Sequence, residues 1–140
     1  MISVEDLLSK TLKEKGYSLT KPRQLVFEEI NKSAPLTVRQ LIDQINNKVD
    51  RASVYRTLAL FEETNVIQRI YAGWKYKVEL SDRFNEHHHH LTCQKCGKVI
   101  PLHDQQLEKF IDDVAEKADF KITSHQLEIQ GLCKSCAKSN

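Results

Sequence analysis

Two Cys-x-x-Cys pairs constrain this chain more than any other feature. Cys93 and Cys96 form the first pair, Cys133 and Cys136 form the second, and 36 residues separate them. Two thiolates spaced by two residues can hold one ion from a tight turn, so two such pairs complete a tetrahedral shell suited to Zn²⁺. Gly97 after the first pair permits a positive φ in that turn. The pattern predicts a structural zinc site, and because four ligands close the shell, no catalysis is expected there.

Disulfides and a redox-active Cys-x-x-Cys are the alternative interpretations of these cysteines. The N-terminus has no basic stretch followed by an apolar core, so we expect no signal peptide and a cytoplasmic location. In a reducing compartment, four cysteines bind a metal more often than they form two disulfides. No membrane partner is expected, because the longest apolar run, residues 58–61, is far shorter than the roughly 20 residues of a spanning helix.

All the cysteines and histidines lie after residue 80. Residues 1–80 carry 13 Lys and Arg against 10 Asp and Glu, a net charge of +3, whereas residues 81–140 carry 8 against 9, a net charge of −1. This segregation predicts two modules, residues 1–80 and 87–140, joined by a polar hinge at residues 81–86. The net charge of +2 for the whole chain is too small to indicate nucleic acid or a membrane by itself.

The first module has the pattern of helices followed by one hairpin. Apolar residues at helical spacing predict four helices, and Thr20, Thr37 and Asp50 are the expected N-caps of the last three. Alternating residues then predict strands at residues 66–71 and 74–80, with the turn at Ala72 and Gly73. Four helices and a hairpin in about 80 residues are typical of a winged helix-turn-helix domain.

The fourth helix, from about residue 51 to 64, carries the residue types that read DNA. A tyrosine ring can stack on thymine methyl groups, and arginine and hydroxyl groups can bind phosphates. Ser53, Arg56 and Thr57 are expected on the exposed face, and the alternative is an ordinary solvated face with Tyr55 half buried. The candidate DNA-binding residues, which include a helix start and the hairpin, are Arg23, Ser53, Tyr55, Arg56, Thr57, Lys75 and Lys77.

Four consecutive histidines, His87 to His90, precede the first cysteine pair. If this segment is extended, His87 and His89 face one way and His88 and His90 face the other. Each pair can supply two imidazoles to a separate metal, so the run predicts two sites rather than one. The alternative is a solvated cluster that binds metal only adventitiously.

The rest of the second module predicts a small α+β unit. Strands are expected at residues 91–92 and 99–100, and a strand at 120–129 would carry His125 on one face. An amphipathic helix at 105–118 is expected to bury four residues, namely Leu107, Phe110, Ile111 and Val114. The further candidate ligands are Glu79, His103, Asp104 and Glu108.

Together these residues resemble the ferric uptake regulator (Fur) family of bacterial metalloregulators over nearly the whole chain. The matching segments are residues 19–23, 52–58, 87–98 and 124–127, with the second cysteine pair. The resemblance implies an N-terminal winged helix-turn-helix domain, a hinge, and a small α/β dimerisation domain with a Cys₄ zinc site. It implies a homodimeric repressor of double-stranded operator DNA, for which a divalent metal is the corepressor.

The resemblance also implies which residues form each site. The structural Zn²⁺ would be held by Cys93, Cys96, Cys133 and Cys136, and a regulatory Zn²⁺, Fe²⁺ or Mn²⁺ at the hinge would be held by Glu79, His88 and His90. An additional metal site would use His87, His89, Glu108 and His125. Tyr55 and Arg56 match the DNA-reading pair of the family.

The sequence departs from the family pattern at four positions. Pro35 and Pro101 stand where members often have a hinge histidine and an acidic ligand, which leaves His103 or a residue near Asp82 to complete the shell. Ser18 replaces a basic residue that reaches the minor groove in some members. His89 stands where some have Asp, and the extra nitrogen favours Zn²⁺.

Other functions remain open at this stage. A peroxide sensor of the same fold, and a regulator that binds DNA constitutively because its sensing site has degraded, are the alternatives closest to a metal-dependent repressor. A zinc hydrolase or a thiol oxidoreductase would be enzymes. No enzyme is expected, because the chain lacks a Gly-rich loop, a Ser-His-Asp set and a His-Glu-x-x-His motif.

Overall fold

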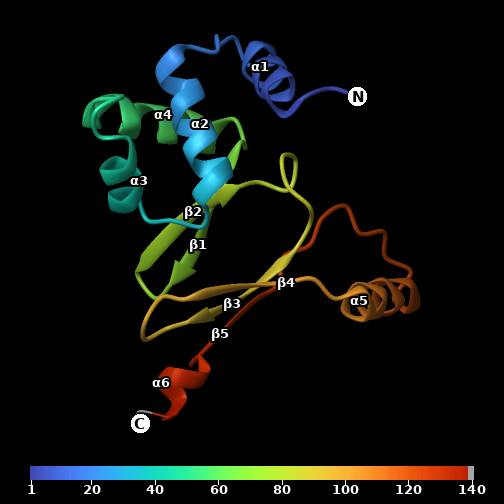
Figure 1. Ribbon diagram of the computed structural model, residues 1–140. Helices are drawn as coiled ribbons and strands as arrows, with labels where there is room; N and C mark the ends of the chain where they lie inside the picture. Colours follow the sequence, from blue (N-terminus) through green and yellow to red (C-terminus); the bar gives the residue numbers. More distant parts are fainter. Residues whose placement is uncertain (139–140) are drawn as a thin grey trace. The chain divides into compact units, whose positions relative to one another are not determined.

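The computed structural model describes residues 1–138, which divide into two compact units, the first ending at Glu86 and the second beginning at His87 (Figure 1). The helices of the first unit are α1 (Val4–Glu14), α2 (Lys21–Ser33), α3 (Val38–Ile45) and α4 (Arg51–Glu63). No helix among the described residues is long and apolar enough to cross a membrane.

The three predicted N-caps are confirmed. The Thr20 hydroxyl accepts from the Arg23 amide, and the Asp50 carboxylate accepts from the Ser53 amide at 3.0 Å. Thr37 and Gln40 form a reciprocal capping box at the start of α3. Each side chain satisfies an amide that the first helical turn leaves without a partner, which is why α2, α3 and α4 begin where they do.

The helices of the first unit enclose a continuous apolar core. Phe27 of α2 and Phe61 of α4 lie at its centre, with ring centroids 6.4 Å apart in an edge-to-face arrangement. Phe84 also packs on Phe27, with a centroid distance of 5.6 Å. Residues 81–86 are therefore anchored on this unit, and the Ser81 hydroxyl donates to the Asn65 carbonyl at 2.7 Å.

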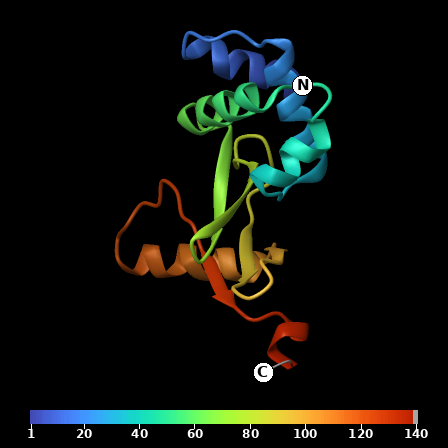
Figure 2. The same ribbon diagram turned by 90° about the vertical axis from the view of Figure 1, so that its left-hand side faces the viewer.

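A hairpin of β1 (Ile67–Ala72) and β2 (Lys75–Leu80) completes the first unit (Figure 1 and Figure 2). Ala72 pairs with Lys75, so the two-residue turn consists of Gly73 and Trp74, and the prediction of Ala72 and Gly73 was wrong by one position. Gly73 has φ +66, which glycine adopts without strain. Helices followed by this hairpin form the expected winged helix-turn-helix.

The second unit has a three-stranded sheet in the order β4-β3-β5. Its elements are β3 (His89–Cys93), β4 (Val99–Leu102), α5 (Gln105–Lys117), β5 (Glu128–Gly131) and the short helix α6 (Lys134–Lys138). β3 pairs antiparallel with β4 and parallel with β5. The predicted strand at residues 120–129 was wrong in extent: only its last two residues lie in β5, and His125 lies in the connection that precedes it.

The apolar face of α5 is not buried within one chain. Phe110 is 65% exposed and Val114 is 51% exposed, so the prediction that both face a core was wrong for the single chain. Leu107 and Ile111 are only half buried. A unit of about 50 residues with three short strands has too little interior to cover a whole helix face.

Candidate metal centres and nucleic-acid interface

The four cysteines meet at one point of the second unit. Cys93 ends β3, Cys96 follows in the adjoining turn, and Cys133 and Cys136 lie around the start of α6. All four sulfur atoms lie within 4.8 Å of one another. The Sγ atoms of Cys96 and Cys133 are 3.8 Å apart, about the edge of a tetrahedron with zinc–sulfur bonds of about 2.3 Å. The cluster therefore fits a closed zinc site.

Hydrogen bonds favour the ionised form that zinc needs at two of the four thiols, Cys93 and Cys133. The backbone amide of Cys96 lies 3.5 Å from Cys93 Sγ, and hydrogen bonds of this kind lower the pKa of Cys93 to about 6. The backbone amide of Cys136 lowers the pKa of Cys133 in the same way. The hydrogen bond with Cys133 raises the pKa of Cys136 to about 12, because two adjacent thiols share one proton. Gly97 has the expected positive φ, +79.

A second donor cluster joins β3, α5 and the connection before β5. Glu108 lies at its centre: its carboxylate contacts His89 Nε2 at 2.6 Å and His125 Nε2 at 2.7 Å. His87 Nε2 lies 3.1 Å from His125 Nε2. Partial burial raises the pKa of Glu108, but the His89 hydrogen bond and the nearby histidine charges outweigh it and hold this pKa below its usual value. One carboxylate and three imidazoles around one point suit a divalent transition metal.

The even-numbered histidines form a separate pair. His88 Nε2 and His90 Nε2 face each other at 3.0 Å, and both side chains are buried. The imidazole of His103 lies beside His88, with a centroid distance of 5.4 Å. The alternation expected of an extended segment is thus present in the structure, which places the odd- and even-numbered histidines in different clusters. Glu79, the third expected ligand, belongs to the first unit, where it accepts from the Gln68 side chain at 2.7 Å.

The exposed start of α4 carries part of the predicted DNA-binding set. Tyr55 is 52% exposed, so it is not part of the core. Arg56 donates to the Ser53 hydroxyl at 3.1 Å, and this hydroxyl donates to Asp50 at 2.6 Å. The expected exposure of Thr57 was wrong, because Thr57 is 4% exposed and lies on the buried side of α4.

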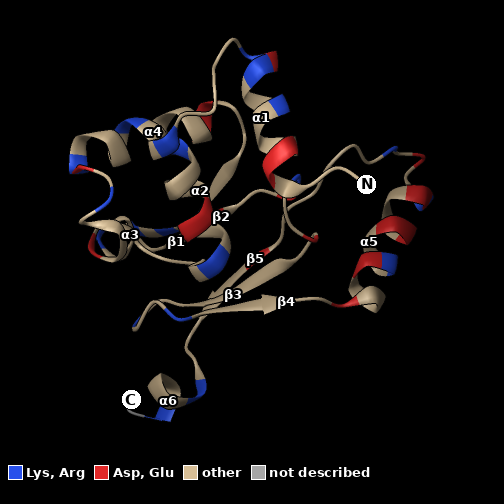
Figure 3. Ribbon diagram, turned by 45° about the horizontal axis from the view of Figure 1, so that its top comes forward, with Lys and Arg blue, Asp and Glu red and all other residues tan. Residues whose placement is uncertain are grey.

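Arg23 lies beside the same helix start. Its guanidinium donates to the Ser18 carbonyl at 2.6 Å and lies 5.8 Å from the centre of the Tyr17 ring. Arg23, Arg56 and hydroxyl-bearing residues line a pocket of about 210 Å³ between the starts of α2 and α4. Two cations beside two helix N-termini favour an anion such as phosphate. α4 carries Arg51 and Arg56 in its first half and two glutamates at its end, whereas acidic residues prevail on α5 (Figure 3).

Sequence reasoning missed one exposed residue of the hairpin. Trp74, at the tip, is 85% exposed, and the Lys75 ammonium lies 5.4 Å from the centre of its ring. Lys75 and Lys77 lie on one strand two positions apart, so they share a face. The signal that could have predicted the exposure of Trp74 is its place in the turn, because connecting segments run over the protein surface.

Comparisons with known proteins agree with this arrangement. Residues 14–130 match the model of the ferric uptake regulator family. A ferric uptake regulation protein from Legionella pneumophila is 36% identical over 91% of this chain and 97% of its own length. A peroxide operon regulator from Bacillus subtilis is 30% identical over 92% of this chain and 90% of its own length.

Solved structures give the same result for the fold. The Helicobacter pylori ferric uptake regulator, described as having three functional metal-binding sites, matches with a TM-score of 0.79 and 27% identity over 97% of this chain and 95% of that chain. The Cys₄ cluster and the histidine clusters of the present chain fit structural and regulatory metals. With the family model matching most of its length, this chain belongs to the ferric uptake regulator family of transcription regulators.

Proposed function

We propose that the protein is a metal-dependent repressor that binds operator DNA as a homodimer. Residues 1–80 bind double-stranded DNA, residues 81–86 act as the hinge, and residues 87–140 bind metal and dimerise. The supporting observation is that the four adjacent histidines divide between two donor clusters. The four cysteines form a third cluster. A chain of this size has no other evident need for three such clusters.

The cysteine cluster has the structural role, and a histidine site has the regulatory one. Zn²⁺ on Cys93, Cys96, Cys133 and Cys136 would be fully coordinated by protein, so it stabilises the second unit without responding to the cell's metal supply. His88 and His90 are the proposed core of the regulatory site, with Glu79 as third ligand. Because Glu79 belongs to the first unit and both histidines to the second, a metal bound by all three restricts the motion of one unit against the other.

Such a restriction can act as a switch. A dimer binds a two-fold operator only when its two recognition helices reach successive major grooves together. To convert a population from mostly open to mostly closed, metal binding must favour the closed dimer by about 5 kcal/mol. One such site per subunit can supply this difference. The other histidine cluster, His87, His89, Glu108 and His125, is the proposed additional metal site.

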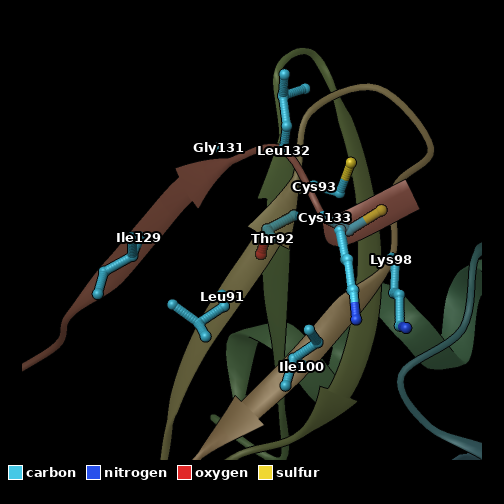
Figure 4. Close-up of a pocket in the computed structure, with 10 residues that line it drawn as sticks. Leu91, Thr92, Cys93, Lys98, Ile100, Ile129, Gly131, Leu132 and Cys133 are labelled. Atoms are coloured by element: carbon cyan, nitrogen blue, oxygen red, sulfur yellow. The ribbon is translucent and has the colours of Figure 1, made fainter. Parts of the chain in front are cut away.

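The dimer itself is proposed from the unburied apolar surface of the second unit. Ile100 and Ile129 on outer strands are about two-fifths exposed, and with Leu91 they point into a shallow pocket of about 300 Å³ (Figure 4). Phe110 and Val114 are exposed on α5. A second copy of this unit would cover these side chains and supply the interior that one chain lacks.

Metal content and DNA binding, measured together, test the proposal. The zinc-loaded protein is titrated with Zn²⁺, Mn²⁺ or anaerobic Fe²⁺, and its affinity for duplexes selected from a random pool is measured at each step. We expect a second metal per subunit to bind and to raise this affinity. One zinc per subunit with metal-independent DNA binding would instead indicate a constitutive regulator.

Paired variants test the division between the two histidine faces. The double substitution of His88 and His90 by Ala should abolish the response to metal and leave the zinc and the dimer intact. The matched substitution of His87 and His89 removes the same number of imidazoles from the other cluster and should preserve the response. If the dimer dissociates only when His88 and His90 are replaced, the assignment of these two histidines to the regulatory site is wrong.

Tyr55→Ala tests the proposed DNA-reading helix. Loss of one base contact should weaken selected duplexes by about 1–3 kcal/mol and random duplexes much less. Tyr55→Phe retains the ring and should bind nearly as well as the unaltered protein. Trp74 is the only tryptophan, so its fluorescence reports directly on whether the hairpin tip meets the duplex. An equal loss of affinity for selected and random duplexes would show that Tyr55 does not contribute to sequence recognition.

Peroxide sensing is the second candidate, favoured by the likeness to the Bacillus subtilis regulator. In such a protein, Fe²⁺ held by the hinge histidines would promote oxidation of one of these ligands by peroxide. The Fe²⁺-loaded protein is treated with peroxide and digested, and the masses of the peptides that contain the histidines are measured by mass spectrometry. Oxygen added to His88 or His90 at low peroxide would support this candidate, and unmodified histidines with retained DNA binding would support a metal sensor.

A further inference from the structure

Glu128 is a carboxylate beside a buried histidine that neither the sequence pattern nor the proposed sites account for. It is the first residue of β5, and its Oε1 lies 2.8 Å from His90 Nδ1. His90 is 2% exposed, whereas the Glu128 side chain is 44% exposed. Glu128 therefore joins a buried imidazole to an ionised group at the surface of the second unit.

The position of Glu128 follows from the pairing of two strands. β5 lies parallel to β3, with Glu128 opposite His90. Further along the two strands, Ile129 lies opposite Leu91 and Gly131 opposite Cys93 (Figure 4). Residues paired in this way project to the same face of a sheet, so their side chains are neighbours. At the far end of both strands, Cys93 and Cys133 converge in the Cys₄ cluster, which holds this register. The contact is thus specified by the backbone and not by a chance rotamer.

The two glutamates of this unit meet their histidines at different ring atoms. Glu108 contacts Nε2 of His89 and of His125, the same atoms that face one another in that cluster. Glu128 instead contacts Nδ1 of His90, whose Nε2 points at His88. A carboxylate at the shared Nε2 side can be a ligand, whereas a carboxylate at the opposite ring nitrogen orients the ring. Glu128 and Glu108 therefore have different roles.

The hydrogen bond at Nδ1 decides which nitrogen of His90 carries the lone pair. A carboxylate accepts only, so Nδ1 must be the donor and the neutral ring keeps its lone pair on Nε2. That atom lies 3.0 Å from His88 Nε2, about the separation of adjacent ligands when metal–nitrogen bonds are about 2.0–2.1 Å.

We propose that Glu128 is a positioning residue that selects the metal-binding tautomer of His90 before metal arrives. It does not touch the metal. It fixes the ring orientation and leaves the lone pair of Nε2 available to bind a metal. Outer carboxylates of this kind are worth 10- to 100-fold in metal affinity. This inference rests on the proposed role of His90 as a regulatory ligand, although its structural part can be tested without a second metal.

The first test is nuclear magnetic resonance of the zinc-loaded full chain with no further metal added. Nitrogen-15 shifts and ring proton couplings distinguish the two neutral tautomers of histidine at a pH where the ring is uncharged. We expect His90 to be protonated at Nδ1 in the unaltered protein and to lose this preference in Glu128→Ala. Glu128→Gln can still accept through its side-chain carbonyl and should keep the preference in part. A His90 that is protonated at Nε2 in the unaltered protein overturns the proposal.

The second test measures metal affinity with a matched control. Glu128→Ala should weaken binding of Zn²⁺ or Mn²⁺ to the second site by about 10- to 100-fold while the Cys₄ zinc stays at one per chain. Gln130→Ala alters the same face of β5 two positions on, where Gln130 accepts a hydrogen bond from Gln94 at 3.0 Å, so its affinity should be unchanged. Equal affinities of the two variants would overturn the proposal. If the unaltered protein takes up no second metal, the proposed function fails, and the tautomer measurement still decides the role of Glu128.

Discussion

The two units of this chain reach stability by different means. In the first, Phe27, Phe61 and the apolar faces of four helices are covered by their own chain. In the second, the described part of α5, β5 and α6 contains no buried residue, and its largest apolar side chain on α5, Phe110, is exposed. One unit is held by a hydrophobic core, whereas the other has little apolar interior and, in the proposed function, would be held by zinc and covered by a second copy. The comparison teaches that the cysteine cluster lies in the unit with the smaller apolar interior, where a bound zinc can contribute most to stability.

The largest effect is expected from loss of the zinc ligands. Cys96→Ser should release zinc and unfold the second unit, because a structural zinc supplies much of the folding free energy of so small a unit. The first unit should remain folded. Hydrogen exchange read by mass spectrometry, together with zinc content, separates the two units, and Lys95→Ser in the same turn is the control. Loss of protection throughout residues 1–86 would mean that the units do not fold separately.

Phe27→Ala should give the reverse pattern. Removing a fully buried phenylalanine costs about 3–5 kcal/mol, and here the loss falls on a core that has no metal to support it. DNA binding and the unfolding temperature of the first unit should fall, whereas zinc content stays at one per chain. Chemical unfolding monitored through Trp74 measures the effect. A variant that loses zinc as well would contradict the separation of the two cores.

Phe110→Ala addresses the uncovered face of α5. Truncating a central aromatic of an interface often costs 2 kcal/mol or more, so the dimer should dissociate about 30-fold more readily. The helix content of the single chain should hardly change, since Phe110 is 65% exposed there. Analytical ultracentrifugation measures the dissociation constant, with Asp113→Ala as the control. A large loss of helix with no change in association would place Phe110 in a core within the chain.

The smallest effect is expected at Asp50, the N-cap of α4. The Ser53 hydroxyl and amide hold the pKa of Asp50 below its usual value near 4. A lowered folded pKa means that the carboxylate stabilises the native state above the unfolded pKa, and that this stabilisation is lost as the pH falls through the folded value. Asp50→Ala should therefore lower the melting temperature slightly at pH 7 and less at pH 3. Asp50→Asn, which keeps an acceptor without a titrating group, should show no such pH dependence.

Local patterns determined much of the architecture. The caps at Thr20, Thr37 and Asp50 depend on hydrogen bonds within one helical turn, so the local sequence is enough to predict them. The period of two along an extended chain was enough to separate His87 and His89 from His88 and His90. The cysteine spacing predicted one four-sulfur cluster, because a turn of four residues has few geometries and brings both thiols of a pair to one point.

Tertiary packing decided the remaining features. Thr57 and Tyr55 look equally exposed in a helical pattern, and only the neighbouring helices leave Tyr55 in solvent and bury Thr57. The exposure of Phe110 follows from the small size of the sheet, which no local pattern records. The sequence could not predict Glu128 as a partner of His90, because 37 residues separate them. The parallel register between β3 and β5 brings the two residues together. Spacing along the chain thus determined which residues can bind metal, and long-range pairing decided which groups orient them, because orientation requires a neighbour that the local sequence does not contain.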